Sequence, residues 1–198
     1  VIASIISTFI ALFAAKAFTR YRVKYSGLSY GAILLPFIIP EIIIAVAFIV
    51  IWTSMGLKLG LVPITISHIL YCTPFCLLIL ISRMDGFDKS LEEASMDLGE
   101  NIFGTFWRVT FPLLLPGIIA SLLLSFVISF DEFILAFFLS SSDQTLPIYM
   151  WSQLRFPKKL PHVLALGAII IVATSFIVML SYWFRNLGQS NNNRGSHI

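Results

Sequence analysis

Charged side chains are scarce in this sequence. Asp, Glu, Lys and Arg together make up only 12% of its 198 residues, whereas 58% are hydrophobic, and the mean hydropathy is +0.93. Soluble domains carry about 25% charged residues, so this composition excludes an ordinary water-soluble domain. It predicts an integral membrane protein.

Motifs of several enzyme classes are also lacking. The sequence contains no GxxxxGK[ST] loop for nucleotide phosphates, no HExxH metal pair and no GxSxG nucleophile turn. Its two cysteines, Cys72 and Cys76, form neither a CxxC motif nor a disulfide framework, and we expect them to be small core residues of an apolar run. The chain is therefore not expected to hydrolyse nucleotide or to hold a metal ion or cofactor itself.

The positive charge is dispersed. The formal net charge is +3, but Lys and Arg gather on no single helix or tail, so nucleic acid is not an expected partner. Membrane orientation explains the basic residues better, because cytoplasmic loops retain Lys and Arg.

Long apolar runs dominate what is present. A membrane-spanning helix needs about 20 mostly apolar residues, and the sequence has five such runs, at residues 1–18, 32–52, 62–81, 113–139 and 163–184. The predicted fold is an all-α, polytopic transmembrane helical bundle over residues 1–186. Residues 83–112 form its longest polar loop, and residues 187–198 are expected to be a disordered polar tail.

The basic residues predict the orientation of the bundle. Arg20, Arg22 and Lys24 follow the first run, which places that loop, the loop 83–112 and the tail in the cytoplasm. One external loop departs from the rule, because it holds Arg155, Lys158 and Lys159. On this orientation the first residue is external and is not a Met, so we expect one further span upstream and six in the intact protein.

The loop 83–112 has the pattern of two short helices. Residues 90–112 read SLEEASMDLGENIFGTFWRVTFP, in which Ser90 and Glu93 have the spacing of a capping box and Gly99 is placed to end the helix. The residues that recur at helical spacing in between are Leu91, Ala94, Ser95 and Leu98. A second short helix is expected to carry Phe103, Phe106 and Trp107 before Pro112 opens the next span.

The charge of this loop favours a protein partner. It holds six acidic and three basic residues, whereas a helix resting on an anionic lipid surface should be basic. An interfacial pair of helices is the alternative interpretation.

The loop resembles the cytoplasmic signature of ATP-binding-cassette (ABC) importer permeases, which reads EAAxxxG, then nine residues, then IxLP. Glu93, Ala94, Ser95 and Gly99 match its first part, and Pro112 closes the second part after Val109 and Phe111. Ser95 stands in place of the second alanine, Val109 of isoleucine and Phe111 of leucine. In that family the loop is a coupling helix that docks on a cytoplasmic ATPase, so the resemblance implies that Glu93, Ala94, Ser95, Gly99 and Pro112 serve the coupling.

Three acidic residues fall inside the predicted spans, where ionisable groups are costly and usually functional. Glu41 lies about nine residues into its span, close to the midplane, and Pro36 and Pro40 loosen that helix around it. Asp131 and Glu132 lie toward the external end of their span. Carboxylates favour a cationic solute, and Trp52, Tyr149 and Trp151 add aromatic faces near the outer ends. Alternatively, Asp131 or Glu132 faces the water interface or pairs with Arg155 or Lys158.

Several segments together resemble the permease subunits of spermidine/putrescine importers. These are IIPEI, SRMDGFDKSLEEASMDLG, FWRVTFPLLLPGI, SFDEF and TLPIYMWS. The resemblance implies a polyamine as solute, translocated across the cytoplasmic (inner) membrane of a prokaryote. It implies as partners an ABC ATPase dimer that binds ATP and Mg²⁺, a second permease subunit and an extracytoplasmic solute-binding protein.

Other functions stay open at this point. Related permeases carry sulfate, ferric ion or other small solutes. An intramembrane enzyme would draw on Ser67, His68, His162 and Asp131, but no second polar group recurs on the helical face of His68, which favours a buried, hydrogen-bonded histidine. A passive channel would leave the acidic loop unexplained.

Overall fold

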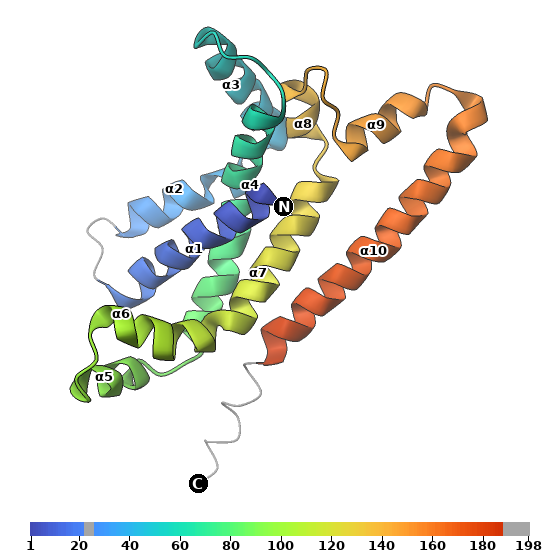
Figure 1. Ribbon diagram of the computed structural model, residues 1–198. Helices are drawn as coiled ribbons and strands as arrows, with labels where there is room; N and C mark the ends of the chain where they lie inside the picture. Colours follow the sequence, from blue (N-terminus) through green and yellow to red (C-terminus); the bar gives the residue numbers. More distant parts are fainter. Residues whose placement is uncertain (22–25, 188–198) are drawn as a thin grey trace.

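The computed structural model describes residues 1–21 and 26–187, which form helices joined by loops (Figure 1). Arg22, Lys24 and the tail from residue 188 onward lie outside the described residues. The elements in chain order are α1 Ile2–Arg20, α2 Ser26–Ile38, α3 Glu41–Ser54, α4 Leu61–Met84, α5 Ser90–Asp97, α6 Ile102–Thr105, a π-helix Phe106–Thr110, α7 Phe111–Asp131, α8 Ile134–Leu139, α9 Leu146–Gln153, a 3-10 turn Pro157–Lys159 and α10 Leu160–Leu187.

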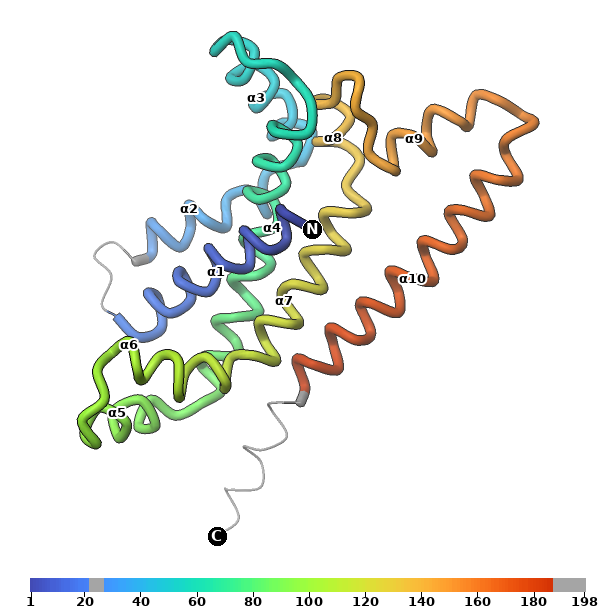
Figure 2. Tube along the Cα trace, viewed as in Figure 1, coloured from blue at the N-terminus to red at the C-terminus, as the bar shows by residue number. Residues whose placement is uncertain are grey.

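Four helical segments among the described residues are long and apolar enough to cross a membrane, namely Ile2–Arg20, Leu61–Met84, Ile102–Asp131 and Pro157–Asn186. A fifth crossing results if the bent pair Gly27–Ile38 and Glu41–Ser54 counts as one span. The polytopic helical bundle is confirmed. Figure 2 follows the chain from α1 through α4 and α7 to α10, with α5 and α6 at one end of the bundle and α3, α8 and α9 at the other.

The second predicted span is not a straight helix. Its two halves, α2 and α3, meet at an angle of 103°. Proline disfavours a helical conformation in the residue before it, so α2 ends at Ile38 ahead of Pro40. The helix restarts at once, because the Pro40 carbonyl accepts hydrogen bonds from the N–H groups of Ile43 (2.9 Å) and Ile44 (3.4 Å). The break falls directly before Glu41, beside the two prolines that loosen this span, and the position of Glu41 near the midplane stays a prediction.

The fourth predicted span is also interrupted. α7 ends at Asp131, and Glu132 is extended (φ −68°, ψ 121°) before α8 begins at Ile134. Residues 113–139 are thus not one continuous span. At its other end this helix begins earlier than predicted, because α6 and the π-helix run into α7 and the apolar segment starts at Ile102. Pro112 lies in the first turn of α7 but does not open the span.

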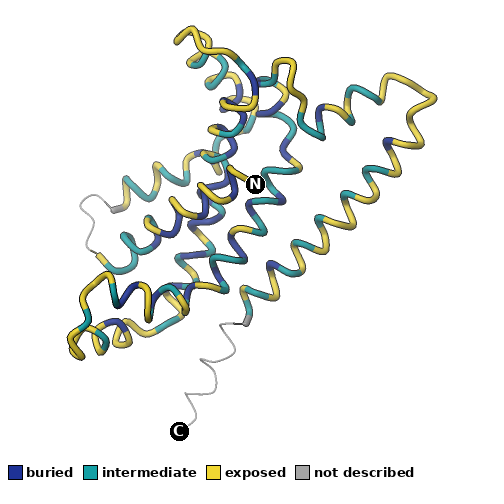
Figure 3. The backbone as a smooth tube through the Cα atoms, in the orientation of Figure 1, coloured by how far each residue is buried: buried dark blue, intermediate teal, exposed yellow. Residues whose placement is uncertain are grey.

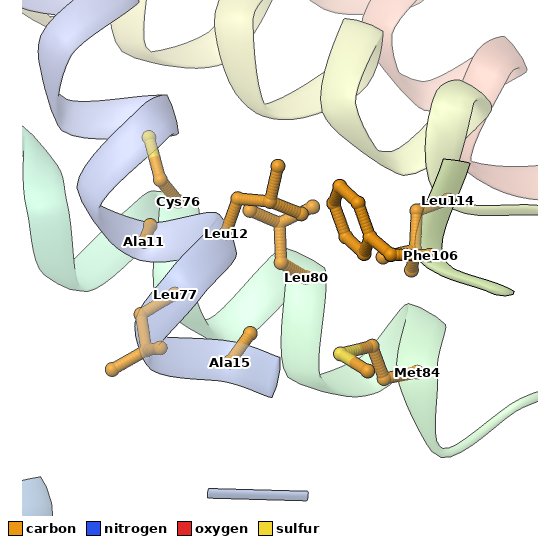
Figure 4. Packing of buried hydrophobic residues seen from close by; sticks show 9 residues of the cluster. All are labelled: Ala11, Leu12, Ala15, Cys76, Leu77, Leu80, Met84, Phe106 and Leu114. Carbon is orange, nitrogen blue, oxygen red and sulfur yellow. The ribbon is translucent and has the colours of Figure 1, made fainter. Parts of the chain in front are cut away.

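The core lies where α1, α4 and α7 pack together. Figure 4 shows Leu12 of α1, Leu80 of α4 and Phe106 of the π-helix converging on one another. Small side chains let these helices approach closely, as is usual inside membranes. Buried small residues of these helices include Ala11, Ala15, Cys72, Cys76, Ala120, Ser121 and Ser125.

Both cysteines belong to this core. Cys72 and Cys76 are free and buried, and their thiols lie 3.6 and 3.7 Å from the carbonyls of Ser125 and Ser121 on α7. The prediction that they are small core residues is confirmed.

α10 packs on the bundle along one side only. Ser181 donates a hydrogen bond to the Ala120 carbonyl of α7 (2.8 Å), but most of the helix is exposed (Figure 3). Its outward face is apolar and includes Leu164, Ile171, Val172, Phe176 and Met179. Such a face requires lipid or another apolar surface as its surroundings.

The close approach of α4 and α7 gives a testable prediction. A Cβ added at Gly117 would lie 2.9 Å from Cγ and 3.1 Å from Cβ of Arg83, whose Nε donates to the Leu113 carbonyl (3.0 Å). Gly117→Ala should therefore destabilise the protein by about 1–3 kcal/mol through overpacking. Gly31→Ala is the control, because no atom lies within 4 Å of its added Cβ.

Thermal unfolding of the purified protein in detergent measures this difference. The Gly117 variant should unfold at a lower temperature than the parent and the Gly31 variant should not. Equal unfolding temperatures for the two variants would contradict the packing described here.

Candidate functional site: the loop between α4 and α7 and the acidic residues of the spans

The first helix of the loop, α5, begins at Ser90, one residue earlier than a capping box with Ser90 as the N-cap predicts. The backbone N–H of Ser90 donates to Oδ1 of Asp88 (3.0 Å), and the side chain of Ser90 does not bond to Glu93. The capping box is therefore wrong, and Asp88 holds the start of α5. Hydrogen bonds from the Ser90 backbone and side chain hold the pKa of the Asp88 carboxyl below its usual value. Glu93 lies 3.5 Å from Nζ of Lys89 instead, in an exposed i,i+4 pair.

Gly99 ends α5 as predicted. It has φ +93°, a region that side chains other than glycine rarely adopt. Its N–H donates to the Met96 carbonyl (2.9 Å), and the N–H of Glu100 donates to the Ser95 carbonyl (3.2 Å). This pair of bonds is the Schellman arrangement, which satisfies the last carbonyls of a helix and reverses the chain.

The outward face of the loop is exposed. Glu93 and Ala94 are exposed on α5, Pro112 is exposed at the start of α7, and Ser95 is half-buried with its hydroxyl 3.1 Å from that of Thr105. Large apolar side chains are exposed around them, namely Leu91, Met96, Leu98, Ile102 and Phe103. The most exposed of these residues is Leu98, with 88% of its surface accessible. An apolar surface of this kind on a polar loop is typical of a binding surface.

The inward face of α5 holds an acid that sequence reasoning missed. Glu92 is only 7% exposed, and its Oε2 lies 2.7 Å from Nε of Arg20 in the last turn of α1. Its Oε1 accepts a hydrogen bond from the hydroxyl of Thr110 (2.5 Å). No local spacing links these three residues, because they lie far apart in the chain, so only the tertiary structure reveals the contact.

The second short helix is α6 together with the π-helix. The side chain of Asn101 caps α6 by accepting from the N–H of Gly104 (2.7 Å), and Arg108 pairs with Glu100. The aromatic rings of Phe106, Trp107 and Phe111 pack against one another along it. The predicted second helix exists but is continuous with α7.

Glu41 lies in the first turn of α3, next to the break after α2. Its carboxylate accepts a hydrogen bond from the hydroxyl of Tyr71 on α4. The pair is partly buried, and Tyr71 packs against the buried apolar cluster of Ile44, Ala45 and Leu135. The structure thus gives Glu41 a phenol partner within apolar surroundings.

Glu132 is buried at the break between α7 and α8. Its oxygens accept from the backbone N–H groups of Leu135 (2.7 Å) and Ala136 (3.0 Å), so it caps α8. His68 places Nε2 3.1 Å from the same carboxylate and Nδ1 2.9 Å from the hydroxyl of Ser129. The prediction of a buried, hydrogen-bonded His68 is confirmed. Glu132 is held by His68 and the α8 backbone rather than by Arg155 or Lys158.

Asp131 is exposed and faces a groove of about 620 Å³ between α7, α9 and α10. Among the described residues it forms no ion pair, and it is the one charged side chain that lines the groove. Trp151 lines the same groove, and the rest of the wall is largely apolar.

The other aromatic candidates lie elsewhere. Tyr149 borders a neighbouring hollow with Gln153 and His162, and Trp52 donates its indole N–H to the Lys58 carbonyl (3.0 Å). The structure therefore brings Asp131 and Trp151 together, while Glu41 and Trp52 lie apart from their groove. Within the described residues, no group of three His, Cys, Asp or Glu side chains is arranged to hold a metal ion.

Comparison with known proteins gives a family match over most of the chain. A family model described as "Binding-protein-dependent transport system inner membrane component" matches residues 7–189. The spermidine/putrescine transport system permease protein PotC of Escherichia coli (strain K12) is 31% identical over 176 residues, covering 88% of this chain and 66% of that protein. PotC of Haemophilus influenzae is 31% identical over 180 residues, covering 90% and 70%.

The putrescine transport system permease protein PotI of Escherichia coli (strain K12) is 28% identical over 188 residues, covering 91% of this chain and 66% of that protein. The chain thus spans about two thirds of the length of these curated relatives.

The different environments of the two neighbouring acids give a prediction. Glu132→Ala removes two hydrogen bonds to the start of α8 and leaves buried His68 without its carboxylate, so it should destabilise the protein by about 2–4 kcal/mol. Asp131→Asn should change stability by no more than about 0.5 kcal/mol, because Asp131 is exposed and unpaired. Denaturant unfolding in detergent measures both, and equal losses would contradict the assignment of Glu132 as a cap.

Proposed function

The chain belongs to the family of binding-protein-dependent transport system inner membrane components, and from that premise we propose that it is the permease subunit of an ATP-driven importer of polyamines. The observation that carries this proposal is the position of α5, a short helix outside the bundle that is fixed from within by Glu92 and exposed on its other face. Its relatives named as spermidine/putrescine and putrescine permeases support the choice of solute.

The exposed face of α5 docks on a cytoplasmic ABC ATPase in this proposal. Glu93 and Ala94 present their side chains outward, Ser95 joins α5 to Thr105, and the turn at Gly99 brings Leu98 to the surface. The partner binds ATP and Mg²⁺ and supplies hydrolysis. The end of the bundle that carries α5 then faces the cytoplasm, as the basic residues also predict.

Glu41 and Asp131 receive the solute in this proposal. Each lies at a place where a helix is interrupted, and interrupted helices commonly line the pathway in transporters. A polyamine carries ammonium groups along an apolar chain, which suits a lone carboxylate beside Trp151 in an apolar groove. Glu132 is assigned a different role, since its oxygens are taken by α8 and His68.

The remaining partners follow from the family and from the exposed surfaces. A second permease subunit or lipid covers the apolar face of α10, and an extracytoplasmic solute-binding protein delivers the solute at the end that carries α9. The complex is placed in the cytoplasmic membrane of a prokaryote, as the organisms of its relatives suggest.

The enzyme interpretation finds little support. The hydroxyl of Ser67 donates to the Ile64 carbonyl (2.9 Å), while the neighbouring His68 bonds to Ser129 and Glu132. His162 lies in the first turn of α10, beside Tyr149 and Lys159. In these contacts no nucleophile is hydrogen-bonded to a general base.

The docking proposal predicts the behaviour of two variants. Gly99→Val forces a branched side chain into a backbone conformation that strains it by about 1–2 kcal/mol, which should distort the turn after α5. Glu93→Ala removes an exposed carboxylate from the docking face. Both should reduce the ATPase recovered when the permease is affinity-purified from membranes that hold the full complex.

Asp143→Asn is the control for docking, because it removes an exposed acid at the opposite end of the bundle. Recovery of ATPase with this variant should equal that of the parent. Parent amounts of ATPase with both Gly99→Val and Glu93→Ala would show that α5 is not the docking helix.

The solute proposal predicts a loss of transport when either acid loses its charge. Glu41→Gln and Asp131→Asn keep the shape of each side chain and remove its charge, so each should lower uptake by about tenfold, the factor that a loss of roughly 1.4 kcal/mol gives. Uptake of radiolabelled spermidine and putrescine into membrane vesicles that hold the full complex measures the effect. ATP hydrolysis in the same vesicles should stay near the parent rate in both variants.

Two results would count against this assignment. Unchanged uptake in the Glu41→Gln, Asp131→Asn double variant would remove both acids from the pathway. Uptake of sulfate by the parent complex would exclude a cationic solute.

A further inference from the structure

Glu92 differs from the other acids of α5 in being buried. Glu93 and Asp97 are exposed on the same helix, whereas the carboxylate of Glu92 points into the bundle. A buried carboxylate requires compensation by an opposite charge and by hydrogen bonds. The structure supplies both, from two different helices.

Arg20 supplies the charge. Its side chain and that of Glu92 are only 10% and 9% exposed, and the 2.7 Å contact between Nε and Oε2 is an ion pair whose N–H is not aligned for a hydrogen bond. The other end of the guanidinium is also engaged, because Nη2 donates to the carbonyls of Met84 (3.1 Å) and Phe87 (3.4 Å). Arg20 therefore joins the end of α1 to the end of α4 and to α5.

Thr110 supplies the hydrogen bond. It is fully buried in the π-helix directly before α7, and its hydroxyl donates to Oε1 of Glu92. A π-helix widens the helical turn and is frequent at functional sites. Glu92 thus contacts α1 through one oxygen and the start of α7 through the other.

We propose that Glu92 is the positioning residue that carries movement of α5 into the bundle, by tying this helix to α1 through Arg20 and to α7 through Thr110. This inference rests on the proposed function, in which the exposed face of α5 docks on an ATPase. Docking alone moves only a short helix on a loop. The buried side of that helix determines whether the spans follow it.

The test separates docking from transmission. Glu92→Gln keeps the shape of the side chain and can still accept from Thr110, but it removes the charge that faces Arg20. The full complex with its ATPase and solute-binding protein is reconstituted in proteoliposomes, and spermidine uptake and ATP hydrolysis are measured in the same vesicles. The complex with Glu92→Gln should contain the same amount of ATPase as the parent complex and should hydrolyse ATP. The amount of spermidine moved per ATP should fall by about tenfold.

Three further variants sharpen this test. Thr110→Val removes the hydroxyl at nearly constant volume and should lower the ratio of spermidine to ATP, whereas Thr110→Ser keeps the hydroxyl and should preserve the ratio. Asp85→Asn removes an exposed acid from the turn after α4, outside α5, and should also preserve it. If Glu92→Gln does not accumulate in the membrane, the comparison of Thr110→Val with Thr110→Ser tests the proposal instead.

The outcomes distinguish the two proposals. If the assembled Glu92→Gln complex or the Thr110→Val complex moves as much spermidine per ATP as the parent, the proposed role of Glu92 is overturned. The proposed function is not affected by that result. A parent complex that binds no ATPase and moves no spermidine removes the proposed function, and this inference with it.

Discussion

A bilayer offers no water to polar groups, so every interruption of a spanning helix has to be satisfied within the protein. At both interruptions in this fold the protein itself satisfies some of these groups. At the break between α2 and α3 the Pro40 carbonyl accepts from the next turn, and at the break between α7 and α8 the carboxylate of Glu132 takes two backbone N–H groups. The acids Glu41 and Asp131 lie directly at these two breaks.

The loop outside the bundle depends on the fold in a different way. α5 is short, and a helix of its length is marginal in isolation, so its stability depends on contacts with the rest of the fold. The buried contact of Glu92 with Arg20 supplies such an attachment, and removal of one partner from a buried ion pair typically costs about 3–5 kcal/mol. One helix thereby combines a fixed inner face with an exposed outer face, which is the arrangement that a mechanical connection between two proteins requires.

Much of the fold could be predicted from the sequence, because apolar runs and the turn at Gly99 are local signals. The spans around α1, α4 and α10, the existence of α5 and the buried His68 follow from them. Local patterns do not reveal which of two adjacent acids faces inward. Glu92 was missed and the capping box was misplaced because tertiary partners, Arg20 and Thr110 for the first and the Asp88 side chain for the second, decide these details. The run 113–139 appeared continuous because hydropathy does not register a single extended residue such as Glu132.

In the proposed function a polyamine, delivered from outside, is imported at the expense of ATP hydrolysed by a partner docked on α5. The most direct test is the ATP hydrolysis rate of the reconstituted complex with its solute-binding protein loaded in turn with spermidine, putrescine, sulfate or no solute. Hydrolysis should rise with the two polyamines and not with sulfate or with the empty binding protein. Stimulation by sulfate alone, or the same rate with every loading, would contradict it.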